Sequence, residues 1–374
     1  MSVAMQASEQ AQDERRIVDL ERIVQELPTD MRDAFERLYR VSSATGHLIP
    51  PEHMHRWIVR YFGSVDSVSE QRVIRVTNLW TLDGALFNGL RAQRPLEARI
   101  SRDLAEQIHR SAPDPFDEPL WNTPEDVFGR IEGEYCITAS NIAKYDGFHG
   151  VVIFREHDPL AFTRESVRDG LNVSKQWFDK CLELDSSAAY PLIMWNCLWK
   201  SGASIPHGHL QVSLTRGMHY GEVERVRQSA VRYRETHQRS YFDDLYAVHE
   251  ALDLGRTING IRVMANITPL KEKECVLMGA TLDDTFSDVI YDVLATLTRD
   301  LNVASFNLVV WQPPYSDTGE DWSDMPVIVR MVDRGDPLSR TADFGAMELY
   351  ASSVVSSDPF RVAQALWNAR PESE

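Results

Sequence analysis

Long apolar runs are absent from this sequence. None of its 374 residues falls in a stretch that approaches the roughly eighteen consecutive apolar residues of a membrane-spanning helix. The amino terminus also lacks the basic start, apolar stretch and small-residue cleavage site of a secretory signal. We therefore expect a cytoplasmic protein with no membrane partner. Because 43% of the residues are hydrophobic, the chain can bury a sizeable core, which excludes a largely disordered protein.

Basic residues are scarce. The chain has 39 Lys and Arg against 56 Asp and Glu, and its formal net charge is −17. No run of basic residues is longer than a pair. An acidic chain of this kind repels nucleic-acid backbones, so a general nucleic-acid-binding protein is excluded. Any phosphate that the protein binds should belong to a small molecule.

Cysteines and several well-known motifs are also few or missing. The four cysteines are far apart and form no Cys-x-x-Cys pair, which predicts buried free thiols rather than disulfides or a thiolate zinc site. The sequence contains no Gly-x-x-x-x-Gly-Lys-Ser, Gly-x-Gly-x-x-Gly or Gly-x-Ser-x-Gly segment. A P-loop ATPase, a dinucleotide oxidoreductase and an α/β-hydrolase therefore have no support.

The pattern of apolar residues predicts an α+β fold with a helical N-terminal extension over residues 1–68. Apolar residues recur at helical spacing over residues 13–39, and another helix is expected between Pro50 and Gly63. Two units follow, over residues 69–218 and 219–374, and the second begins with a long charged helix. Each unit has the order strand, strand, helix, strand, strand. We expect each to form an antiparallel sheet flanked by helices.

The most informative segment runs from Ser201 to Val212 and reads Ser-Gly-Ala-Ser-Ile-Pro-His-Gly-His-Leu-Gln-Val. If its second half is a strand, the two-residue period places His207, His209 and Gln211 on one face. Two imidazoles and one amide would then line the same surface.

The turn before this strand is small and polar. Ser201, Gly202 and Ser204 can offer backbone N–H groups and hydroxyls to an anion, as phosphate-binding loops do. Gly208, between the two histidines, would leave space for a ligand to approach. The sequence therefore predicts an anion site beside the histidines.

A histidine beside an anion site can act as a nucleophile on phosphorus. Neutral imidazole, with an ordinary pKa of about 6.5, is available at physiological pH. Its ring nitrogen would attack an α-phosphorus and leave a nucleotidyl-histidine for an acceptor phosphate to collect. Gln211 would donate to a non-bridging oxygen as negative charge develops. Ordinary strand histidines and a zinc ligand pair are the alternatives, and the polar turn and the glutamine favour the nucleophile.

The segment resembles the active-site strand of the histidine-triad superfamily, and within it the branch of galactose-1-phosphate uridylyltransferase and the diadenosine tetraphosphate phosphorylases. The resemblance rests on Asn196-x(6)-Ala203-Ser204-x-x-His207-x-His209-x-Gln211. It implies two tandem histidine-triad-like units, with His209 as the nucleophile, Gln211 and Ser204 on the phosphate, and Asn196 on the nucleotide. Gln211 stands where triad hydrolases have a third histidine, which is similar to the transferases.

Other segments extend the resemblance. Arg91-Ala-Gln-Arg94-Pro95 is similar to an early segment of the family in which two arginines bind phosphates, and Asn141 begins a segment similar to its first nucleotide-contacting strands. Without the family, the arginines would be read as solvated. Phe344 and Glu348 lie in a segment that resembles the sugar-phosphate contacts. The candidate nucleotide- and phosphate-binding residues are thus Arg91, Arg94, Asn141, Asn196, Ser201, Gly202 and His207.

The sequence also departs from the family. Gly208 replaces a usual proline, and the hexose-contacting lysine and glutamine have no obvious counterparts. The family's structural zinc uses two cysteines and two histidines. Here His157 and His207 match the histidines, and Asp114 and Asp117 take the place of the cysteines. Zn²⁺ is a possible cofactor on this donor set, and solvated acids with a hydrogen-bonded His157 are the alternative.

These observations lead to three functional hypotheses. The first is a nucleotidyltransferase that moves a nucleoside monophosphate from a nucleotide sugar to a sugar 1-phosphate, as galactose-1-phosphate uridylyltransferase does. The second is a dinucleoside polyphosphate or nucleotide-sugar phosphorylase that uses the same histidine and inorganic phosphate. The third is a nucleotide-binding sensor without turnover. The resemblance also implies a homodimer.

Overall fold

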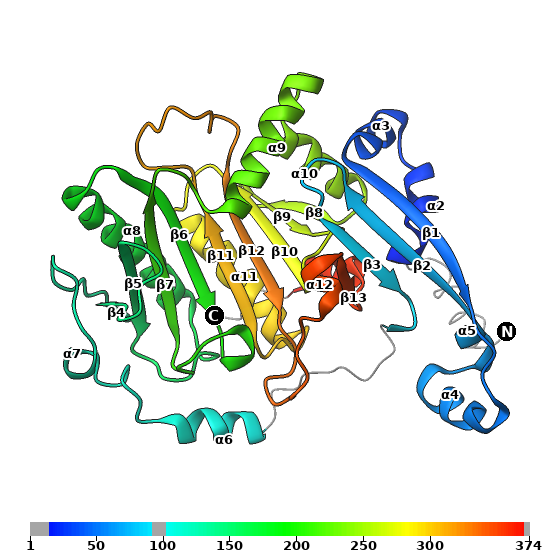
Figure 1. The fold of residues 1–374 in the computed structure, drawn as a ribbon, viewed down its shortest axis with the longest axis horizontal. Helices are drawn as coiled ribbons and strands as arrows, with labels where there is room; N and C mark the ends of the chain where they lie inside the picture. The colour runs from blue at the N-terminus through cyan, green and yellow to red at the C-terminus, as the bar shows by residue number, and fades with distance from the viewer. Residues whose placement is uncertain (1–14, 92–101, 370–374) are drawn as a thin grey trace.

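The computed structural model describes residues 15–91 and 102–369 of the chain. Its largest feature is a nine-stranded sheet in which every neighbouring pair of strands is antiparallel (Figure 1). In order across the sheet, the strands are β4 (Cys136–Ser140), β5 (Phe148–Phe154), β7 (His209–Arg216), β6 (Ala188–Asn196), β11 (Phe306–Trp311), β12 (Val327–Asp333), β10 (Glu272–Gly279), β9 (Ile261–Ala265) and β8 (Gly255–Ile258).

This sheet is built from two similar halves. The first has the order β4-β5-β7-β6 and the second the order β9-β10-β12-β11. Along the chain, each half has a long helix between its second and third strands. Helix α8 (Arg164–Leu184) joins β5 to β6, and α11 (Asp284–Arg299) joins β10 to β11. The halves meet where β6 pairs with β11. The two expected units are confirmed, and they share one continuous sheet.

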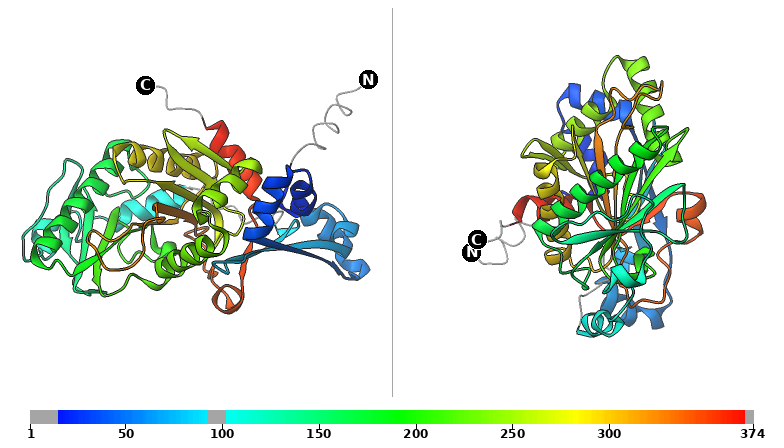
Figure 2. Two further views of the ribbon diagram at one scale, coloured as in Figure 1. Left: turned by 90° about the horizontal axis from the view of Figure 1, so that it is seen from above. Right: turned by 90° about the vertical axis from the view of Figure 1, so that its left-hand side faces the viewer.

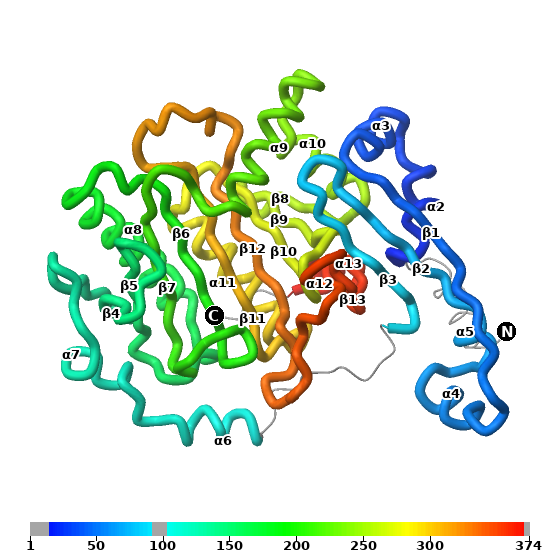
Figure 3. Tube along the Cα trace, in the orientation of Figure 1, coloured from blue at the N-terminus to red at the C-terminus, as the bar shows by residue number. Residues whose placement is uncertain are grey.

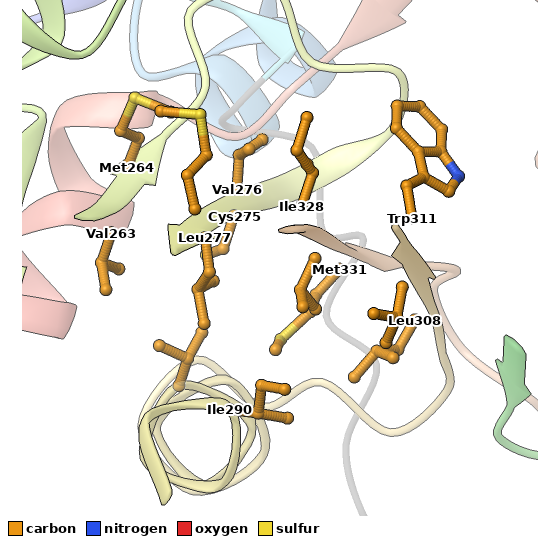
Figure 4. Close-up of a cluster of buried hydrophobic side chains, with 14 of the residues drawn as sticks. Val263, Met264, Cys275, Val276, Leu277, Ile290, Leu308, Trp311, Ile328 and Met331 are labelled. Carbon is orange, nitrogen blue, oxygen red and sulfur yellow. The ribbon is translucent and has the colours of Figure 1, made fainter. Parts of the chain in front are cut away.

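Helices α8 and α11 pack against each other and cover one face of the sheet. Figure 4 shows the alternation of the strand residues in the second half: Leu277 and Met331 point toward Ile290 of α11, and Val276 and Ile328 point to the other side. Both faces of this half are buried, and the face away from α11 also contains the charged residues Glu274 and Arg330. In the first half, the face away from α8 carries the candidate site instead.

The other helical segments lie around the sheet edges and in the connections. They are η1 (Ile17–Asp19), α2 (Leu20–Gln25), α3 (Thr29–Leu38), η2 (Glu52–Met54), α4 (His55–Phe62), α5 (Val65–Ser69), α6 (Arg102–Ser111), α7 (Pro119–Asn122), η4 (Trp199–Ser201), α9 (Gly221–His237), α10 (Tyr241–Ala251), α12 (Ala346–Tyr350) and α13 (Pro359–Asn368). The long charged helix expected after residue 219 is divided into α9 and α10. Gln238 adopts a positive φ between them, and the Ser240 side chain caps α10.

A second, four-stranded sheet lies beside the large one (Figure 2). Its strands are β1 (Tyr39–His47), β2 (Glu70–Asn78), β3 (Gly84–Asn88) and β13 (Ser353–Val355). The helical N-terminal extension expected over residues 1–68 forms, and strand β1 lies within it between α3 and α4. Helices α2 and α3 form as expected, but the chain then pairs with β2 at nine positions. The sequence boundary after residue 68 therefore falls within the β1–β2 connection. Figure 3 shows the C-terminal elements α12, β13 and α13 between the two sheets.

Two further expectations can be compared with the structure. Within residues 15–91 and 102–369, no helix is both long enough and apolar enough to cross a membrane. All four cysteines are buried and free, as the sequence predicts.

Candidate functional site

His209 and Gln211 lie on β7, between strands β5 and β6 and on the face of the sheet away from α8. The intervening Leu210 points the opposite way, because its Cδ1 lies 3.3 Å from where a Cβ on Gly170 of α8 would be. The predicted strand period is therefore confirmed here. His207 lies two residues before the first residue of β7, and its side chain is buried.

The ring of His209 is held by one backbone hydrogen bond. Its Nδ1 lies 2.8 Å from the carbonyl oxygen of His207. A carbonyl only accepts, so Nδ1 carries the proton and Nε2 keeps its lone pair. Burial lowers the pKa of His209, which favours the neutral ring. His209 thus has the tautomer and the charge of a nucleophilic imidazole.

The amide of Gln211 is oriented by His149 on β5, a residue that we did not select from the sequence. The backbone N–H of Tyr145 donates to His149 Nδ1 over 3.1 Å, so the proton of the neutral ring sits on Nε2. Burial lowers the pKa of His149. His149 Nε2 lies 3.2 Å from Gln211 Oε1 and can donate to it. The NH₂ group of Gln211 is thereby left for a ligand.

Asn141 belongs to the same corner of the site. Its Nδ2 lies 3.5 Å from His149 Nε2, and its Oδ1 accepts from the backbone N–H of Ala143. The structure therefore brings this candidate residue close to Gln211. Tyr145 stacks on His149 with ring centroids 4.2 Å apart.

The polar turn of residues 197–204 contains two residues with positive φ, Leu198 at 65° and Gly202 at 101°. Such a φ is unusual at a non-glycine residue, and it marks a constrained turn. The Ser201 hydroxyl donates to the carbonyls of Cys197 and Leu198. Its proton is therefore not free for an anion, which differs from the expectation. The Ser204 side chain is exposed and has no hydrogen-bond partner among the described residues.

Gly208 has a different role from the one expected. A Cβ at this position would lie 3.2 Å from Cδ2 of Phe154 and 3.4 Å from Cα of Pro159. Gly208 therefore faces the packed side of the strand, opposite the two histidines, and it does not open space for a ligand. Its small size is required by the packing of Phe154.

An apolar surface adjoins His209. The side chains of Ile137, Ala139, Val151 and Ile153 form a small cluster against Phe116. Ile153 pairs with His209, so it lies on the same face of the sheet. The Phe116 and His209 rings meet edge to face, with centroids 5.2 Å apart. The candidate nucleophile therefore has an apolar, buried environment on this side.

The four candidate metal ligands converge as the sequence predicts. One donor atom from each of Asp114, Asp117, His157 and His207 lies within 4.8 Å of all the others. His207 Nε2 donates to the carbonyl of Phe154 over 2.7 Å, which leaves a lone pair on Nδ1. That atom is buried without a hydrogen-bond partner and lies 3.4 Å from Asp114 Oδ1.

The second imidazole of this group, His157, faces an acceptor with each ring nitrogen. His157 Nε2 lies 3.2 Å from the carbonyl of Ile108, and Nδ1 lies 3.1 Å from Asp117 Oδ1. Asp114 Oδ2 is a further buried atom without a hydrogen-bond partner. A cation between these residues would bind the lone pair of His207 Nδ1 and the two carboxylates, so the donor set fits a divalent metal. The His207 carbonyl links this group to His209.

The candidate acceptor segment lies at the end of the second half. The Phe344 ring lies 4.3 Å from Lys271 Nζ and 5.4 Å from the Arg334 guanidinium carbon. The Glu348 carboxylate accepts from the backbone N–H of Gly345 and caps α12. Burial opposes the charge of Glu348, but the backbone N–H of Gly345 and then the charges of Lys271 and Arg91 lower its pKa below the usual value. Arg91 is therefore near this segment, and Arg94 lies outside the described residues.

The second half has no equivalent of the catalytic pair. Gln211 pairs with Met194, Met194 with Val309, and Val309 with Arg330. Strand β12, which corresponds to β7, contains neither histidine nor glutamine. The side chain of Arg330 is instead buried in an ion pair with Glu274.

No family model matches the sequence, and no curated protein matches it. Similar solved structures exist at low sequence identity. An ADP-glucose phosphorylase from Arabidopsis thaliana with bound ADP-glucose is 16% identical, with a TM-score of 0.58 over 77% of this chain and 96% of that one. A GalT-like protein from Arabidopsis thaliana is 16% identical, with a TM-score of 0.56 over 69% and 93%.

A uridylyltransferase is 14% identical to this chain, with a TM-score of 0.52 over 66% of this chain and 88% of the other. These proteins are of the kind that the active-site strand resembles. The chain therefore shares the fold of these proteins.

Proposed function

We propose that the protein is a nucleotidyltransferase that forms a covalent nucleotidyl-histidine at His209. The ring of His209 carries this proposal. Its proton is held on Nδ1 by the His207 carbonyl, and its free Nε2 shares a face with the Gln211 amide. A histidine that only supports the fold needs neither a fixed tautomer nor an oriented donor beside it.

In the first half-reaction, His209 Nε2 attacks the α-phosphorus of the nucleotide. A P–N bond forms, the bond from the α-phosphorus to the bridging oxygen breaks, and that oxygen leaves on the phosphate product. The Nδ1 proton stays against the His207 carbonyl and stabilises the positive charge on the ring. In the second half-reaction, an oxygen of the acceptor phosphate attacks the phosphorus, the P–N bond breaks, and neutral His209 returns.

Three groups would bind the reacting phosphate. The NH₂ of Gln211 donates to a non-bridging oxygen, and the exposed Ser204 hydroxyl and the backbone of the turn at Gly202 complete the cradle. Asn196 would donate to the nucleotide from the end of β6. The nucleobase would lie on the apolar surface formed with Phe116.

We assign the substrates by chemistry. The donor is a nucleotide sugar, and the acceptor is a sugar 1-phosphate bound near Phe344. Phosphorolysis is the second candidate. The segment around Asp343 has no counterpart of the hexose-contacting lysine of the uridylyltransferase family, and the Asp343 carboxylate is bound to Arg334. Inorganic phosphate would need no sugar contacts in this segment.

We also propose that Asp114, Asp117, His157 and His207 bind a divalent cation. When bound, the metal would have a structural role: it would supply the positive charge that the two carboxylates and two imidazole lone pairs lack. His207 would then be fixed in place, and its carbonyl would hold the His209 ring.

Product analysis tests the reaction. Purified protein would be incubated with UDP-glucose, ADP-glucose or GDP-glucose, with either galactose 1-phosphate or inorganic phosphate. Anion-exchange chromatography should detect a new nucleotide sugar in the first case, and a nucleoside diphosphate in the second identifies a phosphorylase. His209→Ala should make neither. Nucleotide binding without any product would favour a sensor and contradict the proposal.

A further inference from the structure

The amide of Asn196 is held by a chain of polar contacts from the second half of the molecule. Asn196 pairs directly with Asn307 across the β6–β11 junction. Asn307 Nδ2 donates to Asn196 Oδ1 over 2.6 Å and to the carbonyl of Ser201 over 3.0 Å. The side chain of Asn307 on β11 thus contacts both Asn196, a candidate nucleotide-binding residue, and the polar turn of residues 197–204.

The orientation of Asn307 is in turn fixed by Arg334. The guanidinium NH1 donates to Asn307 Oδ1. Arginine has no acceptor, so the oxygen of Asn307 must face it and the NH₂ group must face Asn196. The oxygen of Asn196 is then occupied, and its NH₂ group is the part that projects toward a ligand.

Arg334 is also bound to the candidate acceptor segment. Its Nε and NH2 lie 2.6 Å and 3.0 Å from the two carboxylate oxygens of Asp343, a bidentate pair. Asp343 directly precedes Phe344, which packs against the guanidinium. The Arg334 guanidinium is therefore held in place by Asp343, and it orients the side-chain amides of Asn307 and Asn196.

We propose that Arg334 is a positioning residue that acts through Asn307 to present the N–H donors of Asn196 to the nucleotide. The second half of the molecule, which has no catalytic histidine, thereby orients a ligand of the first. This inference rests on the proposed function, because it assumes that a nucleotide binds beside His209.

The near-isosteric variant Asn307→Asp reverses the orientation. Its carboxylate keeps the contact with Arg334 but presents an acceptor to Asn196, so the Asn196 amide rotates and turns its oxygen toward the nucleotide. The nucleotide then loses the N–H donor of Asn196 and faces its oxygen instead. This change should weaken nucleotide binding about 10- to 100-fold. Asn307→Ala removes the constraint without reversing it, so its loss should be smaller.

The experiment measures binding of UMP, AMP and GMP in turn by calorimetry, together with the unfolding temperature of each variant. The inference predicts that Asn307→Asp weakens binding more than Asn307→Ala does, and that Asp343→Asn causes a smaller loss. A purely structural role predicts the opposite order, because deleting the side chain disturbs packing more than a near-isosteric change. Asn368→Asp adds the same charge at an exposed site and should change nothing.

The outcomes separate this inference from the proposed function. If Asn307→Asp binds the nucleotides as tightly as the wild type, or if Asn307→Ala is the weaker binder, the positioning role is wrong while the chemistry at His209 stands. If the wild type forms no nucleotidyl adduct and binds none of the three nucleotides, both proposals fail. Should Asn307→Asp not fold, undiminished binding by Asp343→Asn would contradict the positioning role.

Discussion

At the scale of single residues, the site depends on which atom of each polar group carries the proton. The carbonyl of His207 decides this for His209, and the N–H of Tyr145 decides it for His149. Through His149, the Gln211 amide is turned so that its NH₂ faces a ligand. Each reacting group therefore relies on a second residue that never touches the substrate.

The variant His149→Phe tests this dependence. It keeps an aromatic ring against Tyr145 but removes the hydrogen bond to Gln211. Because the Gln211 amide is then free to rotate, we expect nucleotidyl-adduct formation to slow about 10- to 100-fold. Rapid-quench mass spectrometry measures the rate, and the exposed His53→Gln serves as control. An unchanged rate in His149→Phe would contradict the role of His149.

The sequence indicated the candidate nucleophile but not the residues that contact its neighbours in the site. His207, His209 and Gln211 are two residues apart, so the strand period alone places them on one face. His149, Asn307 and Arg334 reach the site through pairing between strands that are far apart in the chain. Their partners depend on strand register, which hydrophobic periodicity does not specify.

At the scale of elements, the differences between the expected and the observed strands and helices also arise from contacts between distant segments of the chain. Strand β1 contains mostly polar and small residues, and most of its length is exposed. No alternating apolar pattern marks it, and its pairing with β2 is what makes it a strand. Strand β7, in contrast, was predicted because it is buried between two neighbours and has a clear period. The α9–α10 break was missed because Gln238 is not a residue that usually ends a helix.

The metal-site prediction belongs to this scale, because three connections supply its ligands. The purified protein should retain a divalent metal, and EDTA should lower the unfolding temperature because the cation binds only the folded state. The double variant Asp114→Asn/Asp117→Asn should lose both the metal and the EDTA effect. Mass spectrometry of the metal content and thermal unfolding measure the two quantities.

A matched control is Glu118→Gln/Glu125→Gln, which removes the same charge from exposed nearby positions. It should keep the metal and the wild-type unfolding temperature. Metal-free wild-type protein whose stability is unaffected by added Zn²⁺ or Mn²⁺ would contradict the assignment of this site.

At the scale of the whole molecule, two similar halves have taken different roles. In the second half a buried ion pair replaces the catalytic pair: Arg330 NH2 lies 2.7 Å from Glu274 Oε1, with the two side chains 8% and 0% exposed. The Glu274 carboxylate also accepts from Asn266 and from the backbone N–H of Leu270. Under our proposals, this half supports the fold and orients Asn196 rather than reacting.

The ion pair makes a stability prediction. Glu274→Gln leaves the buried Arg330 charge without its partner, which should lower the free energy of unfolding by about 3 kcal/mol. Glu21→Gln breaks an exposed pair with Arg72 of similar length and should cost less than about 1 kcal/mol. Urea unfolding measures both values. Equal losses in the two variants would show that burial does not determine the cost.

Buried histidines predict how stability depends on pH. Burial lowers the pKa of His219 to about 4 and that of His249 to about 4. In the unfolded chain their pKa returns to about 6.5, so the unfolded state binds more protons between these values. The free energy of unfolding should therefore be full above pH 6.5 and fall as the pH drops toward 4, by about 3 kcal/mol per histidine.

Urea unfolding across this pH range checks the prediction. The variant His249→Gln should show a shallower fall than the wild type, and the exposed His53→Gln should not. A wild-type free energy of unfolding that stays constant from pH 6.5 to pH 4 would mean that the two buried histidines do not control acid stability.

The central claim is the covalent intermediate at His209, and intact-mass spectrometry tests it most directly. The protein would be incubated without acceptor with UDP-glucose, ADP-glucose, GDP-glucose, ATP and diadenosine tetraphosphate separately. We predict a mass gain of a single nucleoside monophosphate per chain with at least one donor, labile in acid and absent from His209→Ala. An unchanged mass with every donor that the protein binds, or an adduct that survives in His209→Ala, would contradict the claim.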